Sequence, residues 1–166
     1  MTATYQANVP LVLFETLRAD LARTANKGYA PKITLAIFRL GQYGGRNWRW
    51  LWLLGDRIYL RLLIGAELPP AITCGAGLAL PHGGRGLVIH PDVSIGGNSM
   101  IFHRVTLAAT AAGAPQLADN VTIGTGACVL GPVKVGSGAK IGANAVVVSD
   151  VPDGASVAAP AAIRVR

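Results

Sequence analysis

The sequence is poor in the residues that mark secreted, membrane-spanning or nucleic-acid-binding proteins. Its two cysteines, Cys74 and Cys128, are too few for a disulfide framework. No apolar run approaches the roughly 18 residues that cross a bilayer, and Met1 to Pro10 lacks the pattern of a signal peptide. No basic run or aromatic ladder indicates nucleic acid, although the net charge is +7. We therefore expect a cytoplasmic protein that binds acidic or phosphorylated partners and no nucleic acid.

A six-residue period dominates the second half of the chain. An apolar residue recurs at every sixth position from Leu117 to Val147, and the residue four positions after each one is small or β-branched. The same spacing occurs between Leu68 and Leu107, with extra residues only at 81–88 and 108–116. This period is typical of a parallel β-helix, in which each hexapeptide forms one side of a three-sided coil. Insertions in such repeats form loops, often where ligands bind.

The first part of the chain has a helical pattern instead. Apolar residues at helical spacing predict an amphipathic helix over 11–25, a second helix over 32–43, and a third over 47–65. We therefore divide the chain into a helical extension, 1–66, and a β-helix, 67–166.

The third predicted helix is unusual because Trp48, Trp50 and Trp52 alternate with basic Arg49. We favour a helix that covers the open end of the β-helix and packs against neighbouring subunits, since an open core and exposed strand edges must be covered. The alternative is peripheral contact with an anionic membrane, which would place the protein at the inner face of that membrane.

The repeat places two of the three histidines together. His82 follows Leu80 by two residues, and His103 follows Ile101 by two residues, one full turn later. We expect the two side chains to lie one strand spacing apart, about 4.8 Å. Such a pair suits general-base catalysis, because an imidazole can accept a proton near neutral pH. The alternative is a pair of polar surface histidines, and two histidines without a third ligand predict no metal site.

Two long segments resemble the serine acetyltransferase branch of the hexapeptide acyltransferases. They are GLALPHGGRGLVIHPDVSIGGNSMIFHRVTL (77–107) and NVTIGTGACVLGPVKVGSGAKIGANAVVVSDVPDGASVAAPAAI (120–163). The earlier segments LRADLART, IFRLGQY and IGAELPPAITCG resemble the offshoot found in exopolysaccharide gene clusters, the colanic acid or capsule O-acetyltransferases. The resemblance implies an all-β left-handed parallel β-helix, a homotrimer, and acetyl transfer from acetyl-CoA to a hydroxyl.

The resemblance also implies roles for individual residues. The catalytic histidine of the family, in a Leu-Asp-His-Ala-Thr-Gly segment, falls on His82, and Pro81 replaces the aspartate. A second family histidine lies in a Gly-Gly-Asp-Arg-His-Pro loop, but residues 108–116 of this chain read AATAAGAPQ, without an ionisable group. His103 would supply the second imidazole instead.

The family binds CoA on its C-terminal coils at a subunit boundary. The residues expected to contact CoA or the oxyanion are Ala108, Gly124, Gly126, Ala127, Lys140, Gly142 and Ala143. Backbone N–H groups near Ala108 would stabilise the oxyanion, and Lys140 would contact a phosphate. The alternative is that glycine and alanine stand in these positions because the corners of the coils require them.

We therefore predict an acetyl-CoA-dependent O-acetyltransferase that acts on a saccharide hydroxyl in polysaccharide biosynthesis. Serine O-acetyltransferase is one alternative, although loss of the charged loop residues removes the obvious means of holding an amino acid. A non-catalytic trimeric scaffold is the other.

Overall fold

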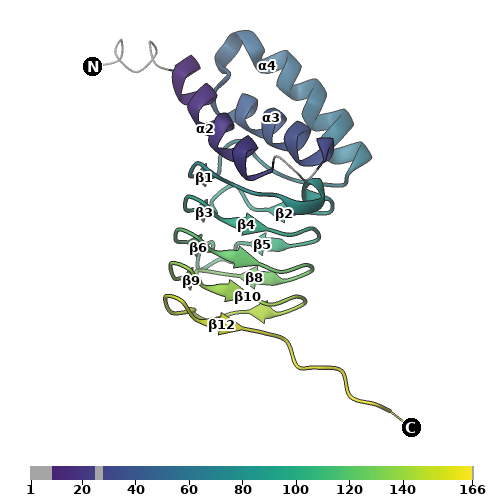
Figure 1. Cartoon of the computed structure of the whole chain (residues 1–166), viewed down its shortest axis with the longest axis vertical. Helices are drawn as coiled ribbons and strands as arrows, with labels where there is room; N and C mark the ends of the chain where they lie inside the picture. The colour runs from purple at the N-terminus through teal and green to yellow at the C-terminus, as the bar shows by residue number, and fades with distance from the viewer. Residues whose placement is uncertain (1–8, 25–27, 166) are drawn as a thin grey trace.

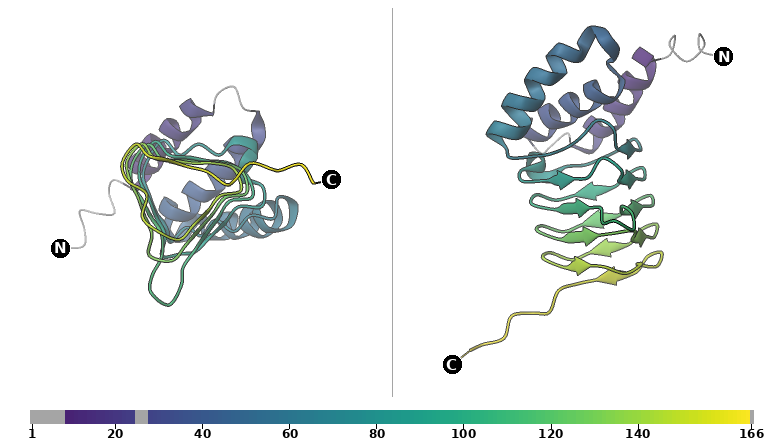
Figure 2. Two further views of the ribbon diagram at one scale, coloured as in Figure 1. Left: turned by 90° about the horizontal axis from the view of Figure 1, so that it is seen from below. Right: turned by 180° about the vertical axis from the view of Figure 1, so that it is seen from behind.

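The computed structural model describes residues 9–24 and 28–165, and it has the predicted architecture. A layer of helices covers one end of a stack of short strands, and the C-terminal residues leave the other end (Figure 1). The strands form three parallel sheets, which are the three sides of a prism (Figure 2). The prediction of a parallel β-helix with an N-terminal helical extension is confirmed.

Each side of the prism is a four-stranded sheet to which successive coils contribute one strand each. The first face contains β1 (Thr73–Cys74), β3 (Ser94–Ile95), β6 (Gln116–Leu117) and β9 (Lys134–Val135). The second face contains β4 (Met100–Ile101), β7 (Thr122–Ile123), β10 (Lys140–Ile141) and β12 (Ser156–Val157). The third face contains β2 (Val88–Ile89), β5 (Thr106–Ala108), β8 (Cys128–Leu130) and β11 (Val146–Val147). The chain runs through the first, second and third faces in that order within each coil.

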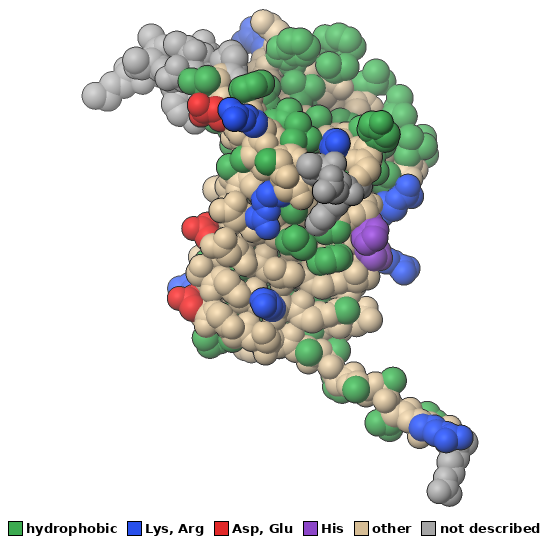
Figure 3. Space-filling view, viewed as in Figure 1, with side chains coloured by type: hydrophobic (Ala, Val, Ile, Leu, Met, Phe, Trp, Pro, Cys, Tyr) green, Lys and Arg blue, Asp and Glu red, His purple; other side chains and the backbone are tan. Residues whose placement is uncertain are grey.

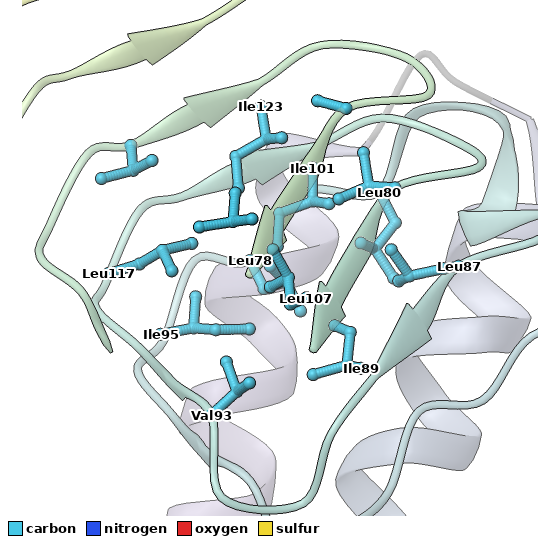
Figure 4. Close-up of a cluster of buried hydrophobic side chains, with 14 of the residues drawn as sticks. Leu78, Leu80, Leu87, Ile89, Val93, Ile95, Ile101, Leu107, Leu117 and Ile123 are labelled. Atoms are coloured by element: carbon cyan, nitrogen blue, oxygen red, sulfur yellow. The ribbon is translucent and has the colours of Figure 1, made fainter. Parts of the chain in front are cut away.

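The six-residue period fills the interior of the prism. Ile95, Ile101 and Leu107, one from each face, point inward and are almost fully buried (Figure 4). The small residues four positions after each repeat residue, such as Ala127 and Ala139, are buried as well. Each buried aliphatic side chain contributes roughly 1.5–3 kcal/mol, so the stacked repeats supply most of the hydrophobic stabilisation.

The individual helices begin and end a few residues away from the predicted positions. Its elements are α2 (Val9–Arg23), α3 (Tyr29–Tyr43), α4 (Gly45–Leu54) and the π-helix η1 (Gly55–Leu63). The last residue of the first predicted helix, residue 25, lies outside the described residues. The third predicted helix is divided into α4 and η1.

The open end of the prism is covered by α3 and η1, not by the tryptophans. Leu35 and Phe38 of α3 and Leu60 of η1 join the buried core. In contrast, α4 buries no residue, and Trp48 and Trp50 are 54% and 66% exposed. The third predicted helix was expected to cover the open end: its second half, η1, does so through Leu60, whereas Trp48 and Trp50 of its first half, α4, do not. Packing of this helix against neighbouring subunits stays a prediction. Figure 3 shows hydrophobic side chains exposed over this helical layer.

Membrane contact through the tryptophans stays a prediction. Within residues 9–24 and 28–165, no helix has both the length and the apolar character needed to cross a bilayer.

The two cysteines differ in environment. Cys74 is buried in the core, and burial raises the pKa of its thiol to about 11, so it is an apolar filler. Cys128 is half-buried within strand β8 on the third face.

A buried ion pair joins the helices to the first coil of the prism. The side chains of Asp20 (α2) and Arg39 (α3) are fully buried, with 2.7 Å between Arg39 Nε and Asp20 Oδ2. Arg39 also donates to the carbonyl oxygens of Cys74 and Gly75, at 2.9 and 2.6 Å. Asp20 Oδ1 accepts the backbone N–H of Leu78 at 2.8 Å. The two charges therefore satisfy each other and hold the backbone of the first coil.

Loss of one partner should strongly destabilise the fold. Asp20→Asn leaves the Arg39 charge buried without compensation, so we expect the free energy of unfolding to fall by about 3–5 kcal/mol. Urea denaturation followed by circular dichroism measures it. The matched control is Asp92→Asn, which removes a 79% exposed carboxylate beside His90 and should change the free energy of unfolding by less than about 1 kcal/mol. Equal losses in the two variants would show that the buried pair is unimportant.

Candidate active site

His82 and His103 lie on adjacent coils at the corner between the second and third faces. Their ring centroids are 4.9 Å apart, and the rings meet edge to face at 78°. The parallel bridge between Ala79 and Met100 sets this register, so the predicted neighbours do meet. His82 is exposed and His103 is half-buried. We call this edge of the prism, in all coils, the histidine corner.

The backbone is unusual at this corner. Among the described residues, five that are not glycine have positive φ: three are asparagines, and the other two are His82 (φ 65°) and Arg104 (φ 60°). Asparagine enters the left-handed region readily, whereas other side chains do so at a cost of about 1–3 kcal/mol. Strain of this kind persists only where the surrounding structure enforces it, and it is commonest at functional sites.

Helix α3 holds the turn that carries His82. This turn is the 3₁₀ element η2 (Pro81–Gly84), and Thr34 Oγ1 donates to the carbonyl oxygen of Gly83 at 2.8 Å. A Cβ on Gly83 would lie 2.9 Å from Cβ of Ala30, so only glycine allows so close an approach of the helix. This insertion was expected to form a loop at Gly83, Gly84 and Arg85, but the two glycines are buried beneath α3 and only Arg85 of the three is exposed.

Thr125 is a polar neighbour of the histidine pair that the sequence reasoning missed. Its Oγ1 lies 3.5 Å from Nδ1 of His103, and the next residue, Gly126, donates its N–H to the carbonyl oxygen of His103 at 3.1 Å. Thr125 follows Ile123 by two residues, which is the position of both histidines in their own coils. The signal that located the histidines therefore also locates Thr125.

Most of the residues expected to bind CoA lie at the histidine corner in later coils. Gly124, Gly126 and Ala127 follow β7, and Gly142 and Ala143 follow β10, the next strand of the same face. The Ala127 side chain is fully buried, so it cannot touch a ligand. A Cβ on Gly124 would lie 2.6 Å from the backbone nitrogen of Ala143, so stacking of the coils alone already requires glycine there.

Lys140 and Ala108 lie away from this column. Lys140 is exposed in β10, just before the corner. Ala108 ends β5 on the third face, beyond which residues 109–115 project as a loop (Figure 2). Two backbone hydrogen bonds between Thr110 and Gly113 close that loop. The predicted insertion is therefore present, but the whole third face separates it from the histidines of the same chain.

Across the described part of the chain, no group of three or more histidine, cysteine, aspartate or glutamate side chains is arranged to hold a metal ion.

Comparisons with known proteins place the chain among the hexapeptide-repeat transferases and then in one family of them. The model of the bacterial transferase hexapeptide (six repeats) matches residues 114–149. Serine acetyltransferase of Staphylococcus aureus is 31% identical over 165 residues, which cover 89% of this chain and 75% of that protein. The Mycobacterium tuberculosis serine acetyltransferase is 38% identical over 126 residues, 69% of this chain and 55% of that protein. The chain belongs to the serine acetyltransferase family of hexapeptide-repeat acyltransferases.

A solved structure agrees with this assignment. Serine acetyltransferase of Neisseria gonorrhoeae, in complex with serine, matches with a TM-score of 0.69 and 28% identity over 88% of this chain and 66% of that chain. The first curated relatives are longer, since the matched part of this chain spans 55%, 58% and 46% of their lengths. These relatives are named serine acetyltransferase, so the comparisons support the family but not the exopolysaccharide branch.

The contact from α3 should position His82 as well as stabilise the fold. Thr34→Val removes the buried hydrogen bond to Gly83, and we expect a loss of about 1–3 kcal/mol in the free energy of unfolding. The imidazole C2–H resonance of His82 should also shift, because the turn loses its support.

Thr24→Val is the matched control. Thr24 is also a buried threonine that bonds helix carbonyls, those of Asp20 and Leu21, far along the chain from the turn. This variant should lose similar stability and leave the His82 resonance unchanged. If both variants shift that resonance equally, α3 has no specific role in positioning His82.

Proposed function

We propose that this protein is an acetyl-CoA-dependent O-acetyltransferase whose reaction takes place at the histidine corner. The observation that carries the proposal is the imidazole pair, 4.9 Å between ring centroids, at an exposed and strained corner. His82 accepts the proton of the acceptor hydroxyl as its oxygen attacks the thioester carbonyl carbon of acetyl-CoA. The tetrahedral oxyanion then collapses, the C–S bond breaks, and the proton passes from the imidazolium to the sulfur of CoA.

The neighbours of His82 replace the aspartate that the family motif places before the histidine. His103 packs against the His82 ring, and Thr125 lies beside His103, so the two polar side chains orient His82 without a carboxylate. We assign His103 to orientation or acceptor binding, and Thr125 to positioning His103.

Acetyl-CoA fits the coils that follow the histidines. Gly124, Gly126, Gly142 and Ala143 leave the corner without bulky side chains, so the pantetheine arm can approach the backbone closely. Lys140, exposed on β10, is the proposed contact for a phosphate of CoA.

Two acceptors are supported by different observations. The names of the relatives favour serine, and the Neisseria gonorrhoeae enzyme was solved with serine. The uncharged loop at 108–116 favours a saccharide or related hydroxyl compound, because an amino acid held there would have its ammonium and carboxylate groups desolvated without partners.

We also propose a homotrimer in which subunits meet through the third face. The outward side chains of the four strands of this face, β2, β5, β8 and β11, are uncharged, and Val146 and Val148 are 65% and 69% exposed. The histidines border one edge of this face, and Ala108 and the 109–115 loop border the other. Packing of a second chain would bring its Ala108 backbone and loop to the histidine corner of the first, and would supply the oxyanion donors.

Removal of the proposed base should abolish most of the turnover. His82→Ala should lower kcat by about 10²- to 10⁴-fold with little change in the affinity for CoA, and His103→Ala should cost less or act mainly on the acceptor KM. Thiol release from acetyl-CoA in the presence of acceptor measures both.

Lys134→Gln is the control, because Lys134 is exposed in β9 of the first face and has no part in the proposed site. It should retain wild-type turnover. Unchanged turnover in His82→Ala would remove His82 from the mechanism, and no acceptor-stimulated thiol release in the wild type would favour the non-catalytic scaffold.

A charge on the third face should break the trimer. Light scattering of the wild type should give about three times the chain mass of 17.1 kDa, whereas Val146→Asp should dissociate because the carboxylate would be buried without a partner. Lys134→Glu, on the exposed first face, is the charge-changing control and should remain trimeric. A stable wild-type monomer in dilute solution would contradict the proposal.

A further inference from the structure

Two arginines accompany the histidine pair, and the mechanism above does not use them. Arg85 follows the turn that carries His82, and Arg104 directly follows His103. The backbone N–H of Arg104 donates to the carbonyl oxygen of Arg85 at 2.8 Å, so the two residues occupy neighbouring coils of one corner. Both side chains are exposed. Figure 3 shows Lys or Arg side chains close to histidine on one side of the molecule.

The charge of this corner is not compensated by carboxylates. The ion pairs found among the described residues join Arg39 to Asp20, Arg61 to Asp56 and Glu67, and His90 to Asp92. All eight acidic residues of the sequence fall within the described ranges, so each can be placed.

None of the eight belongs to the histidine corner. Glu15 and Asp20 lie in α2, Asp56 lies in η1, and Glu67 pairs with Val88 on the third face. The remaining four, Asp92, Asp119, Asp150 and Asp153, lie beside strands of the first face or pair with its backbone. Within one chain, the histidine corner therefore offers two imidazoles and two guanidinium groups, but no carboxylate that would bind an ammonium ion.

The backbone at Arg104 indicates that its side chain is useful. At the equivalent position of the next two coils the chain has Gly126 and Asn144, both residues that favour positive φ. Arginine adopts this conformation at a cost, so its presence here is explained by the guanidinium and not by the turn. Arg85 belongs to the extra residues of its coil, follows the two buried glycines of the turn, and is exposed.

We propose that the acceptor carries an anionic group, a phosphate or a carboxylate, close to the hydroxyl that is acetylated, and carries no ammonium group. This inference rests on the O-acetyltransferase activity proposed above. Two guanidinium groups bind the oxygens of such an anion in a forked geometry and place the neighbouring hydroxyl against His82. A zwitterionic amino acid would leave its ammonium group facing positive charge, and a neutral sugar would leave both arginines unused.

A phosphate could come from CoA instead of the acceptor, so the test must separate the two sources. The double variant Arg85→Gln/Arg104→Asn removes both charges and gives position 104 a residue that tolerates its φ. Lys134→Gln removes one positive charge from the exposed first face as a control. Acetyl transfer is compared for N-acetylglucosamine, N-acetylglucosamine 1-phosphate, glycerate and L-serine, with the KM of acetyl-CoA measured in each variant.

We expect the anionic acceptors to have the higher kcat/KM in the wild type and in Lys134→Gln. In the double variant the kcat/KM for anionic acceptors should fall about 10- to 100-fold, mainly because the acceptor KM rises. The KM of acetyl-CoA should stay unchanged. An equal kcat/KM for neutral or zwitterionic acceptors, untouched by the double variant, would overturn the inference and leave the acetyltransferase activity standing. If only the KM of acetyl-CoA rises, the inference is wrong and the two arginines bind a phosphate of CoA instead.

A binding measurement covers the case in which none of these acceptors is turned over. Titration with inorganic phosphate at constant pH, followed by the imidazole C2–H resonances of His82 and His103, should give saturable shifts in the wild type and in Lys134→Gln. The double variant should bind phosphate at least about 10-fold more weakly. Saturable binding without any acetyl transfer would support the anion site and reject the proposed function, whereas no saturable shift would reject the anion site.

Discussion

The rest of the structure depends on the buried pair of Asp20 and Arg39. Desolvation alone would lower the pKa of Arg39, but the hydrogen bond and charge of Asp20 outweigh it and raise the pKa, so the guanidinium stays charged and holds carbonyls of the first coil. The same helix, α3, carries Thr34, which binds the turn that contains His82 through Gly83. One helix is thus fixed to the prism at two points, and the imidazole lies beside the second.

The six-residue period that fills the core also aligns residues of successive coils along the histidine corner. Because every coil turns the same corner at the same point, residues two positions after the repeat residues stack in register. At the histidine corner these are His82, His103, Thr125 and Ala143, so side-chain size and polarity decrease along the prism. This order matches the proposed chemistry, with the proton acceptor beside the helices and the space for pantetheine along the later coils.

The sequence predicts those features that depend on local repetition. The three faces, the buried repeat residues and the contact of His82 with His103 follow from counting in sixes, and Thr125 follows from the same count. Contacts between distant segments do not follow from it. Gly83 is buried because α3 packs on its turn, and Trp48 is exposed because α3, and not α4, covers the end of the prism. The separation of the 109–115 loop from the histidines required knowing which strand each insertion follows.

The central claim is that acetyl transfer takes place at the histidine corner, and a crystal structure with bound CoA tests it most directly. We expect the CoA sulfur to lie close to His82, within reach of an acceptor oxygen placed about 2.6–3.2 Å from the imidazole. The pantetheine arm should pass Thr125 and Ala143 along the same corner. CoA bound on another face, or with its sulfur far from both imidazoles, would contradict the account.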